Sequence, residues 1–139
     1  MDTIRLGRTN LIVSKNGFGA LPVQRVGMDK ACKILRKAYD GGINYFDTAR
    51  FYTDSEEKIG KALADVRENI IISTKTMATS VEAFWKDLNT SLSLLKTDYI
   101  DIYQFHNPAF CPKPKVFALS NVIGWNWERI VMLLFCIDR

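Results

Sequence analysis

The sequence has little histidine and cysteine, and neither residue type forms a metal-binding pattern. One histidine and three cysteines occur in 139 residues. Cys32, Cys111 and Cys136 form no CxxC pair and have no neighbouring histidine. This pattern argues against a zinc site and against a disulfide framework, and it is typical of a reducing compartment. We therefore expect no metal ligands and a cytoplasmic location.

Long hydrophobic runs and runs of like charge are also missing. The longest apolar run, Ile130 to Ile137, is far shorter than the ~20 residues that a membrane-spanning helix needs. The N-terminal residues lack the apolar stretch of a signal peptide. The 19 basic and 15 acidic residues, with a net charge of +4, are spread along the chain. We expect no membrane segment and no nucleic-acid partner.

What is present is the composition of a globular protein of at most one domain. Hydrophobic residues make up 47% of the chain and charged residues 24%. Turn-prone residues between two apolar segments predict a hairpin over residues 4–13. Short apolar segments then predict four strands, whose ends we place at Gly19, Asp47, Lys75 and His106.

Amphipathic segments lie between these predicted strands. Apolar residues at helical spacing from Ala31 to Ala38 are followed by Gly41 and Gly42, which favour a helix end. A second helix is expected to open at Ser55, and a third is expected to begin with a capping box of Thr79 and Glu82. Regular alternation of strand and helix is typical of parallel β/α units.

The predicted strand ends are nearly evenly spaced along the chain. In a β/α barrel, successive strands point the same way, so their C-terminal ends share one rim, where such folds place their chemistry. Asp47, Lys75 and His106 would then be neighbours on this rim. Tyr52 follows Asp47 by five residues on the same loop, and its side chain could lie over the same opening.

Together these four residues have the chemistry of a carbonyl reductase. A tyrosine with a pKa near ~10 is a weak acid at neutral pH. A neighbouring lysine ammonium would lower the pKa of Tyr52 and let the phenol protonate a carbonyl oxygen as hydride reaches the carbon. Asp47 would hold Lys75, and His106 would orient the carbonyl by a hydrogen bond. Each residue alone also fits a purely structural role, so the hypothesis depends on their coincidence.

Three segments carry a resemblance to a known family. They are Gly42-Ile43-Asn44-Tyr45-Phe46-Asp47-Thr48-Ala49-Arg50-Phe51-Tyr52, Ile72-Ser73-Thr74-Lys75 and Asp98-Tyr99-Ile100-Asp101-Ile102-Tyr103-Gln104-Phe105-His106. They closely resemble the signatures of the aldo-keto reductase family, and the opening Leu6-Gly7-Arg8-Thr9 is similar to its bacterial branch.

The resemblance implies a (β/α)8 barrel that binds NADPH, or NADH, without a Rossmann domain and reduces aldehydes or ketones to alcohols. It also implies that Asp47, Tyr52, Lys75 and His106 form the catalytic tetrad, and that Gly19, Ala20 and Asp47 lie at the cofactor. The absence of a GxGxxG motif agrees with this. The expected substrate is a small carbonyl compound.

A complete barrel needs ~250 residues, so we expect a partial barrel. The predicted architecture is the N-terminal half of the barrel over residues 1–114, with an atypical tail over 115–139. Three origins of the tail are open: an out-of-context end, a fifth strand at Lys115–Asn121 brought forward by a deletion, or an amphipathic helix that covers the sheet edge. An open half barrel would expose apolar side chains and pair with a second copy.

Two functional hypotheses follow. The motifs predict an active NADPH-dependent carbonyl reductase. The length predicts instead a truncated, inactive fragment that acts at most as an interaction or oligomerising module.

Overall fold

The computed structural model describes residues 1–109 and 131–132. Its strands are β1 (Thr3–Arg5), β2 (Ile12–Ser14), β3 (Phe18–Gly19), β4 (Tyr45–Asp47), β5 (Ile71–Thr76), β6 (Ile102–Phe105) and β7 (Val131–Met132). Its α-helices are α1 (Met28–Asp40), α2 (Ser55–Leu63) and α3 (Val81–Leu95). Two 3₁₀ helices, η1 (Leu21–Arg25) and η2 (Ala64–Asn69), lie in the connections.

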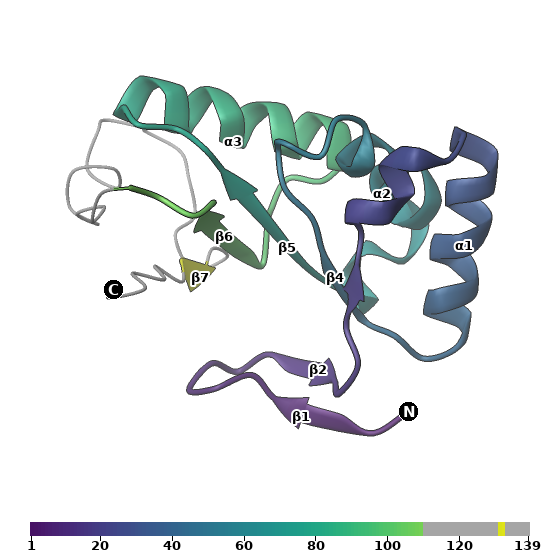
Figure 1. Ribbon diagram of the computed structural model, residues 1–139. Helices are drawn as coiled ribbons and strands as arrows, with labels where there is room; N and C mark the ends of the chain where they lie inside the picture. Colours follow the sequence, from purple (N-terminus) through teal and green to yellow (C-terminus); the bar gives the residue numbers. More distant parts are fainter. Residues whose placement is uncertain (110–130, 133–139) are drawn as a thin grey trace.

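The strands β3 to β7 form one parallel sheet in chain order, and β1 and β2 form a separate antiparallel hairpin. Figure 1 shows α1, α2 and α3 on one side of the parallel strands, with the hairpin apart from them. This arrangement confirms the predicted hairpin and the repeated β/α units. It places the C-terminal ends of the strands at one edge of the layer.

The core lies between the sheet and the helices. Alternate strand residues such as Phe46, Ile72 and Tyr103 are fully buried there, because successive side chains of a strand point to opposite faces. They pack in one cluster with Leu35 of α1, Leu63 of α2 and Leu88 of α3, among others. By the same alternation, Asp47 and Lys75 belong to the face turned away from the helices.

The structure corrects two expectations and leaves two others untested. The α3 helix is capped by Ser80 rather than Thr79, because the Ser80 hydroxyl accepts a hydrogen bond from the Ala83 backbone N–H. Val131 and Met132 form a parallel strand beside β6, not part of a helix. The proposed fifth strand at 115–121 lies outside the described residues, as does the boundary at Pro114.

The expected band of exposed apolar residues is not found on the described strands β3–β6. The exposed large hydrophobic side chains of the described residues lie at the N-terminus, on the hairpin, on α1 and in the segments that follow β3, β4 and β5. Ile102 of β6 is fully buried. Within the described ranges, no helix combines the length and apolar character needed to cross a bilayer.

Candidate active site

The strand ends gather three of the four predicted residues at the rim of the sheet. β3 and β4 end at Gly19 and Asp47, which are paired in register. β5 continues one residue past Lys75, and β6 ends one residue before His106. The His106 backbone N–H still donates to the Thr76 carbonyl, at 2.7 Å, so His106 extends the parallel pairing.

Asp47 and Lys75 form an ion pair at this rim. The Lys75 ammonium lies 2.7 Å from both carboxylate oxygens of Asp47 and 2.8 Å from the Thr48 carbonyl oxygen. The Lys75 side chain is 15% exposed and the Asp47 side chain 33%. Asp47 therefore lies where it can hold Lys75, as the hypothesis requires. Because a third of the Asp47 side chain is exposed, a ligand can reach the pair.

Tyr52 and His106 lie next to this ion pair. The Lys75 ammonium is 5.9 Å from the centroid of the Tyr52 ring. The rings of Tyr52 and His106 meet edge to face, with centroids 5.6 Å apart. The loop that carries Tyr52 is hydrogen bonded to β5 through the Arg50 backbone N–H and the Lys75 carbonyl, at 2.8 Å. All four predicted residues are thus brought together.

The pKa of Tyr52 is raised, contrary to the expected effect of Lys75. Partial burial of the phenol is the main cause, and the negative charge of Asp47 adds to it. The physical reason is that the ammonium of Lys75 is already bound by the Asp47 carboxylate, whose charge offsets it. Tyr52 consequently remains protonated at neutral pH, which is the state that a proton donor requires.

The surroundings of His106 favour the neutral form of its imidazole. Its pKa is lowered, first by burial and then by the positive charge of Lys75, while Asp47 acts in the opposite direction. Its Nδ1 atom is buried and has no hydrogen-bond partner among the described residues. A neutral imidazole has one N–H donor, which suits a hydrogen bond to a carbonyl oxygen.

Gly19 and Ala20, the other predicted cofactor residues, differ in their exposure. Gly19 is exposed, and a Cβ atom added there would meet nothing within 4 Å, so the end of β3 has open space above it. Ala20 is fully buried. Its N–H donates to the Asp47 carbonyl at 2.8 Å, and its own carbonyl accepts from the Ser55 hydroxyl at 3.0 Å. Ala20 therefore supports the end of β4 from within the protein.

Sequence reasoning missed two buried charges beside the site. Glu56 and Lys58 of α2 are only 1% and 2% exposed. The Lys58 ammonium donates to the carbonyls of Val23 and Val26, at 3.0 and 2.8 Å, and thereby binds the segment after β3 to α2. Nothing in the local sequence pattern distinguishes these residues from exposed helix charges.

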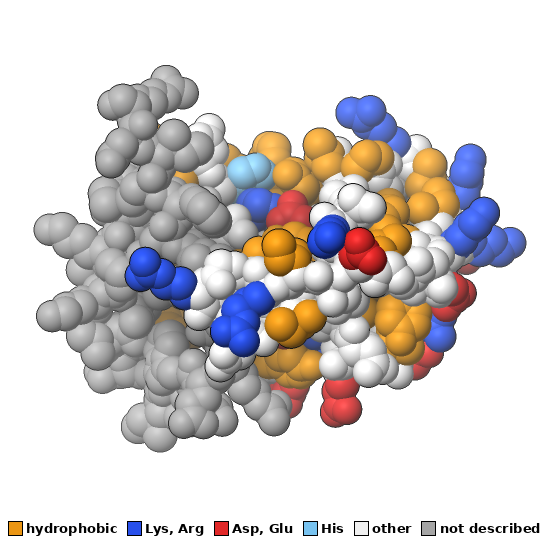
Figure 2. Space-filling view, turned by 90° about the horizontal axis from the view of Figure 1, so that it is seen from below, with side chains coloured by type: hydrophobic (Ala, Val, Ile, Leu, Met, Phe, Trp, Pro, Cys, Tyr) orange, Lys and Arg blue, Asp and Glu red, His pale blue; other side chains and the backbone are white. Residues whose placement is uncertain are grey.

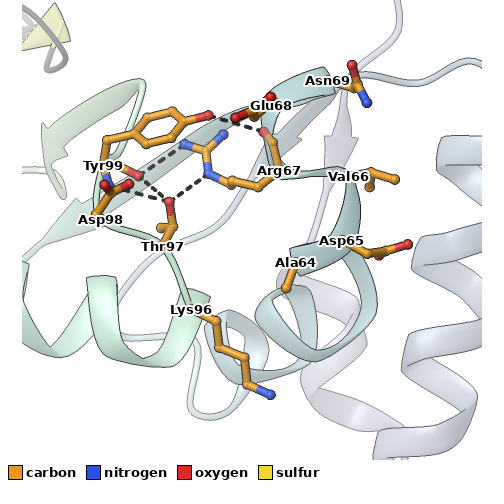
Figure 3. A pocket seen from close by; sticks show the side chains of 10 residues that line it. All are labelled: Ala64, Asp65, Val66, Arg67, Glu68, Asn69, Lys96, Thr97, Asp98 and Tyr99. Carbon is orange, nitrogen blue, oxygen red and sulfur yellow. Dashed lines mark hydrogen bonds between the residues drawn. The ribbon is translucent and has the colours of Figure 1, made fainter.

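A surface pocket of about 620 Å³ lies at the other end of the strands (Figure 3). Its lining comes from η2 and from the turn between α3 and β6, and includes Arg67, Lys96, Thr97 and Tyr99. The Arg67 guanidinium donates to Thr97, to the Ile70 and Tyr99 carbonyls and to Asp101, so its donors serve the fold. This pocket lacks the four clustered residues, and we place the candidate active site at the opposite rim.

The parallel β/α layer with titratable residues at its C-terminal rim is the arrangement of a β/α-barrel protein. The model of the aldo/keto reductase family matches residues 15–121. The chain belongs to this family.

Relatives and solved structures agree with this assignment. L-galactose dehydrogenase of Arabidopsis thaliana is 38% identical over 120 residues, which are 76% of this chain and 38% of that protein. An aldo-keto reductase from Bacillus halodurans, solved in its holo form, superposes with a TM-score of 0.71 at 35% identity and covers 76% of this chain and 40% of its own. A thermostable aldo-keto reductase in complex with the inhibitor epalrestat gives a TM-score of 0.84 at 26% identity, over 100% of this chain and 55% of its own. Since these neighbours are (β/α)8 barrels, the fold is that of part of such a barrel.

The chain spans less than half the length of the curated relatives that it matches. The family match extends to residue 121, beyond Pro114, where the sequence changes character.

Proposed function

We propose that this protein is an oxidoreductase that reduces aldehydes or ketones to alcohols, with Tyr52 as the proton donor. The observation that supports this most directly is the cluster at the rim: a paired Asp47 and Lys75, with the Tyr52 and His106 rings beside them. A phenol and a neutral imidazole at one opening provide two hydrogen-bond donors for a single carbonyl oxygen.

The four residues have distinct roles in this proposal. His106 donates a hydrogen bond to the carbonyl oxygen and orients it toward Tyr52. The hydroxyl proton of Tyr52 passes to the same oxygen as negative charge develops there. The Lys75 ammonium, 5.9 Å from the centroid of the Tyr52 ring, favours the phenolate that remains, and the Asp47 carboxylate holds this ammonium in place.

A nicotinamide cofactor supplies the hydride that reaches the carbonyl carbon. The open space at Gly19 and the Asp47 side chain, which is 33% exposed, leave both residues accessible to such a group. We propose NADPH, with NADH as the alternative, on the family resemblance. Asp47 and Gly19 would lie against this group, and Ala20 would support them through its hydrogen bond to Asp47.

The substrate is proposed to be a small carbonyl compound with an apolar part. Phe51 and Met77, on the loops that follow β4 and β5, are 68% and 54% exposed. The Phe51 ring lies 6.4 Å from the His106 ring, measured between centroids. Figure 2 shows a face of the molecule on which hydrophobic side chains gather around charged groups and the pale blue imidazole. Such a rim favours a hydrophobic group next to the reacting carbonyl.

Fluorescence titration of NADPH against this chain, followed by turnover of an aromatic aldehyde, tests the proposal. Quenching with consumption of NADPH is the expected result. Absence of binding would contradict it and would favour the alternative, an inactive module that acts through interaction.

We further propose a cytoplasmic location and self-association through the barrel edges. A stable monomer on sizing at micromolar concentration would overturn the proposed self-association.

A further inference from the structure

The helix α2 begins with two fully buried polar side chains. Ser55 is 0% exposed and Glu56 is 1% exposed. Their neighbour Glu57, in the same first turn, is exposed. A buried carboxylate is costly unless it is paired and hydrogen bonded, so the contacts of Glu56 indicate what its burial accomplishes.

Glu56 links the two segments that carry Tyr52 and Lys75. Its Oε1 atom accepts a hydrogen bond from the Thr74 hydroxyl at 2.7 Å, and its Oε2 atom forms an ion pair with the Arg50 guanidinium. Thr74 immediately precedes Lys75 on β5. Arg50 lies two residues before Tyr52, and the same guanidinium also reaches the Thr53 carbonyl, on the other side of Tyr52.

Ser55 makes the corresponding link between β3 and β4. Its hydroxyl accepts a hydrogen bond from the Thr48 hydroxyl at 2.9 Å and donates to the Ala20 carbonyl at 3.0 Å. Thr48 follows Asp47, and Ala20 follows Gly19. The contacts of these two adjacent residues therefore reach three strand ends and the tyrosine loop.

We infer that Glu56 is a positioning residue of the candidate active site, which fixes the Tyr52 loop of β4 relative to Lys75 on β5, with Ser55 fixing β4 relative to β3. The expected effect on catalysis rests on the proposed function, whereas the positioning of the Tyr52 loop by Glu56 does not depend on it. Glu56 touches none of the four site residues through its side-chain hydrogen bonds; it acts through Arg50 and Thr74.

Removing the charge of Glu56 should alter geometry more than substrate binding. The carboxylate serves a guanidinium and a hydroxyl at once, and an amide has one oxygen to offer to both. Because a misplacement of ~1 Å between reacting groups costs about 100-fold in rate, a small shift of Tyr52 is enough to lower turnover. A carbonyl substrate would still find the apolar rim of Phe51 and Met77.

The test compares Glu56→Gln with Glu57→Gln, which removes the same charge from the exposed neighbour. We expect Glu56→Gln to lower kcat by about 10-fold to 100-fold with KM changed by less than about two-fold, and Glu57→Gln to resemble the unmodified chain. Equal effects of the two substitutions, or an effect on KM alone, would overturn the inference.

A second measurement does not depend on activity. His106 is the only histidine of the chain, so its ring protons give a single set of NMR signals. The Tyr52 ring lies edge to face with it, and a displaced Tyr52 loop changes the ring-current shift at His106. We expect Glu56→Gln to move these signals and Glu57→Gln to leave them in place.

Thr74→Val provides a milder variant if Glu56→Gln does not fold, because it removes one hydroxyl and keeps the shape of the side chain. It should move the His106 signals in the same direction as Glu56→Gln. Unchanged His106 signals in every folded variant would refute the positioning role. If the unmodified chain shows no turnover, the proposed function fails and the NMR comparison alone decides on Glu56.

Discussion

The Tyr52 ring stands nearly perpendicular to the His106 ring, at an interplanar angle of 88° and a centroid separation of 5.6 Å. This edge-to-face arrangement is a favoured geometry for aromatic pairs. The two residues come from different units of the fold, since Tyr52 lies on the loop after β4 and His106 at the end of β6. Because β5 lies between β4 and β6 in the sheet, the two rings meet over the end of β5, which carries Lys75.

Tyr52→Phe separates the chemistry of the hydroxyl from this packing. The phenyl ring preserves the contact with His106, but it has no proton to give to a carbonyl oxygen. We expect turnover to fall by about 100-fold to 10,000-fold, the usual contribution of a general acid. NADPH affinity, followed by fluorescence titration, should be retained. Loss of affinity together with turnover would contradict the role of Tyr52 as acid.

Asp47→Asn should lower the pKa of Tyr52. The negative charge of Asp47 helps to raise this pKa, and it also occupies the Lys75 ammonium. Without the carboxylate, the positive charge of Lys75 acts on the phenol alone and favours phenolate. The chain has five tyrosines, so the ¹³Cζ resonance of Tyr52 is assigned by comparison with Tyr52→Phe. A pKa that stays the same or rises in Asp47→Asn would refute this account.

His106 predicts a loss of stability on mild acidification. Its pKa is lowered from the ordinary 6.5 by burial and by Lys75, so below pH 6.5 the unfolded chain binds more protons at this site than the folded one. The free energy of unfolding that depends on neutral His106 is therefore fully present above pH 6.5, and it decreases as the pH falls toward the pKa of the folded state. Urea unfolding midpoints across this window, compared with those of His106→Gln, measure it; equal pH dependence in both would exclude His106 as the cause.

The close contact of α2 and α3 predicts that Gly60 tolerates no side chain. A Cβ atom at Gly60 would lie 2.7 Å from the Leu95 carbonyl carbon and 2.9 Å from its Cα. These are backbone atoms, which cannot rotate away. We expect Gly60→Ala to destabilise the fold by about 1–3 kcal/mol or more in urea unfolding. Gly27→Ala is the matched control, because a Cβ atom there meets nothing within 4 Å; equal losses would contradict the packing explanation.

The local patterns predicted the backbone of the site better than its electrostatics. The hairpin and the strand ends at Gly19 and Asp47 follow from turn residues and apolar runs, which act within a few residues. The burial of Glu56 depends on its contact with Thr74, which lies 18 positions away in the chain, and the pKa of Tyr52 is raised first by burial of the phenol and then by Asp47. No period of the sequence encodes such partners. The Thr79 cap was wrong by one residue because Thr79 and Ser80 are both good cap residues.

Two arginines bind aspartates in contrasting surroundings, one almost buried and the other exposed. Arg67 is 8% exposed, and its guanidinium donates a hydrogen bond to Asp101 at 2.6 Å. The Asp101 carboxylate also accepts a hydrogen bond from the Ile72 backbone N–H. Arg36 reaches Asp65 at 2.7 Å, but both of these side chains are well exposed.

Arg67→Met leaves the Asp101 carboxylate, only 11% exposed, without its cation, and breaking a buried pair in this way costs about 3–5 kcal/mol. Arg36→Met removes the exposed pairs with Asp65 and Asp40, which water and salt already screen, so its urea midpoint should stay close to that of the unmodified chain. The two substitutions are otherwise alike in the atoms that they remove. Similar midpoints for both variants would mean that burial does not set the strength of the Arg67–Asp101 pair. The hydrogen bonds of Arg67 could then no longer be assigned to the stability of the fold rather than to a ligand site.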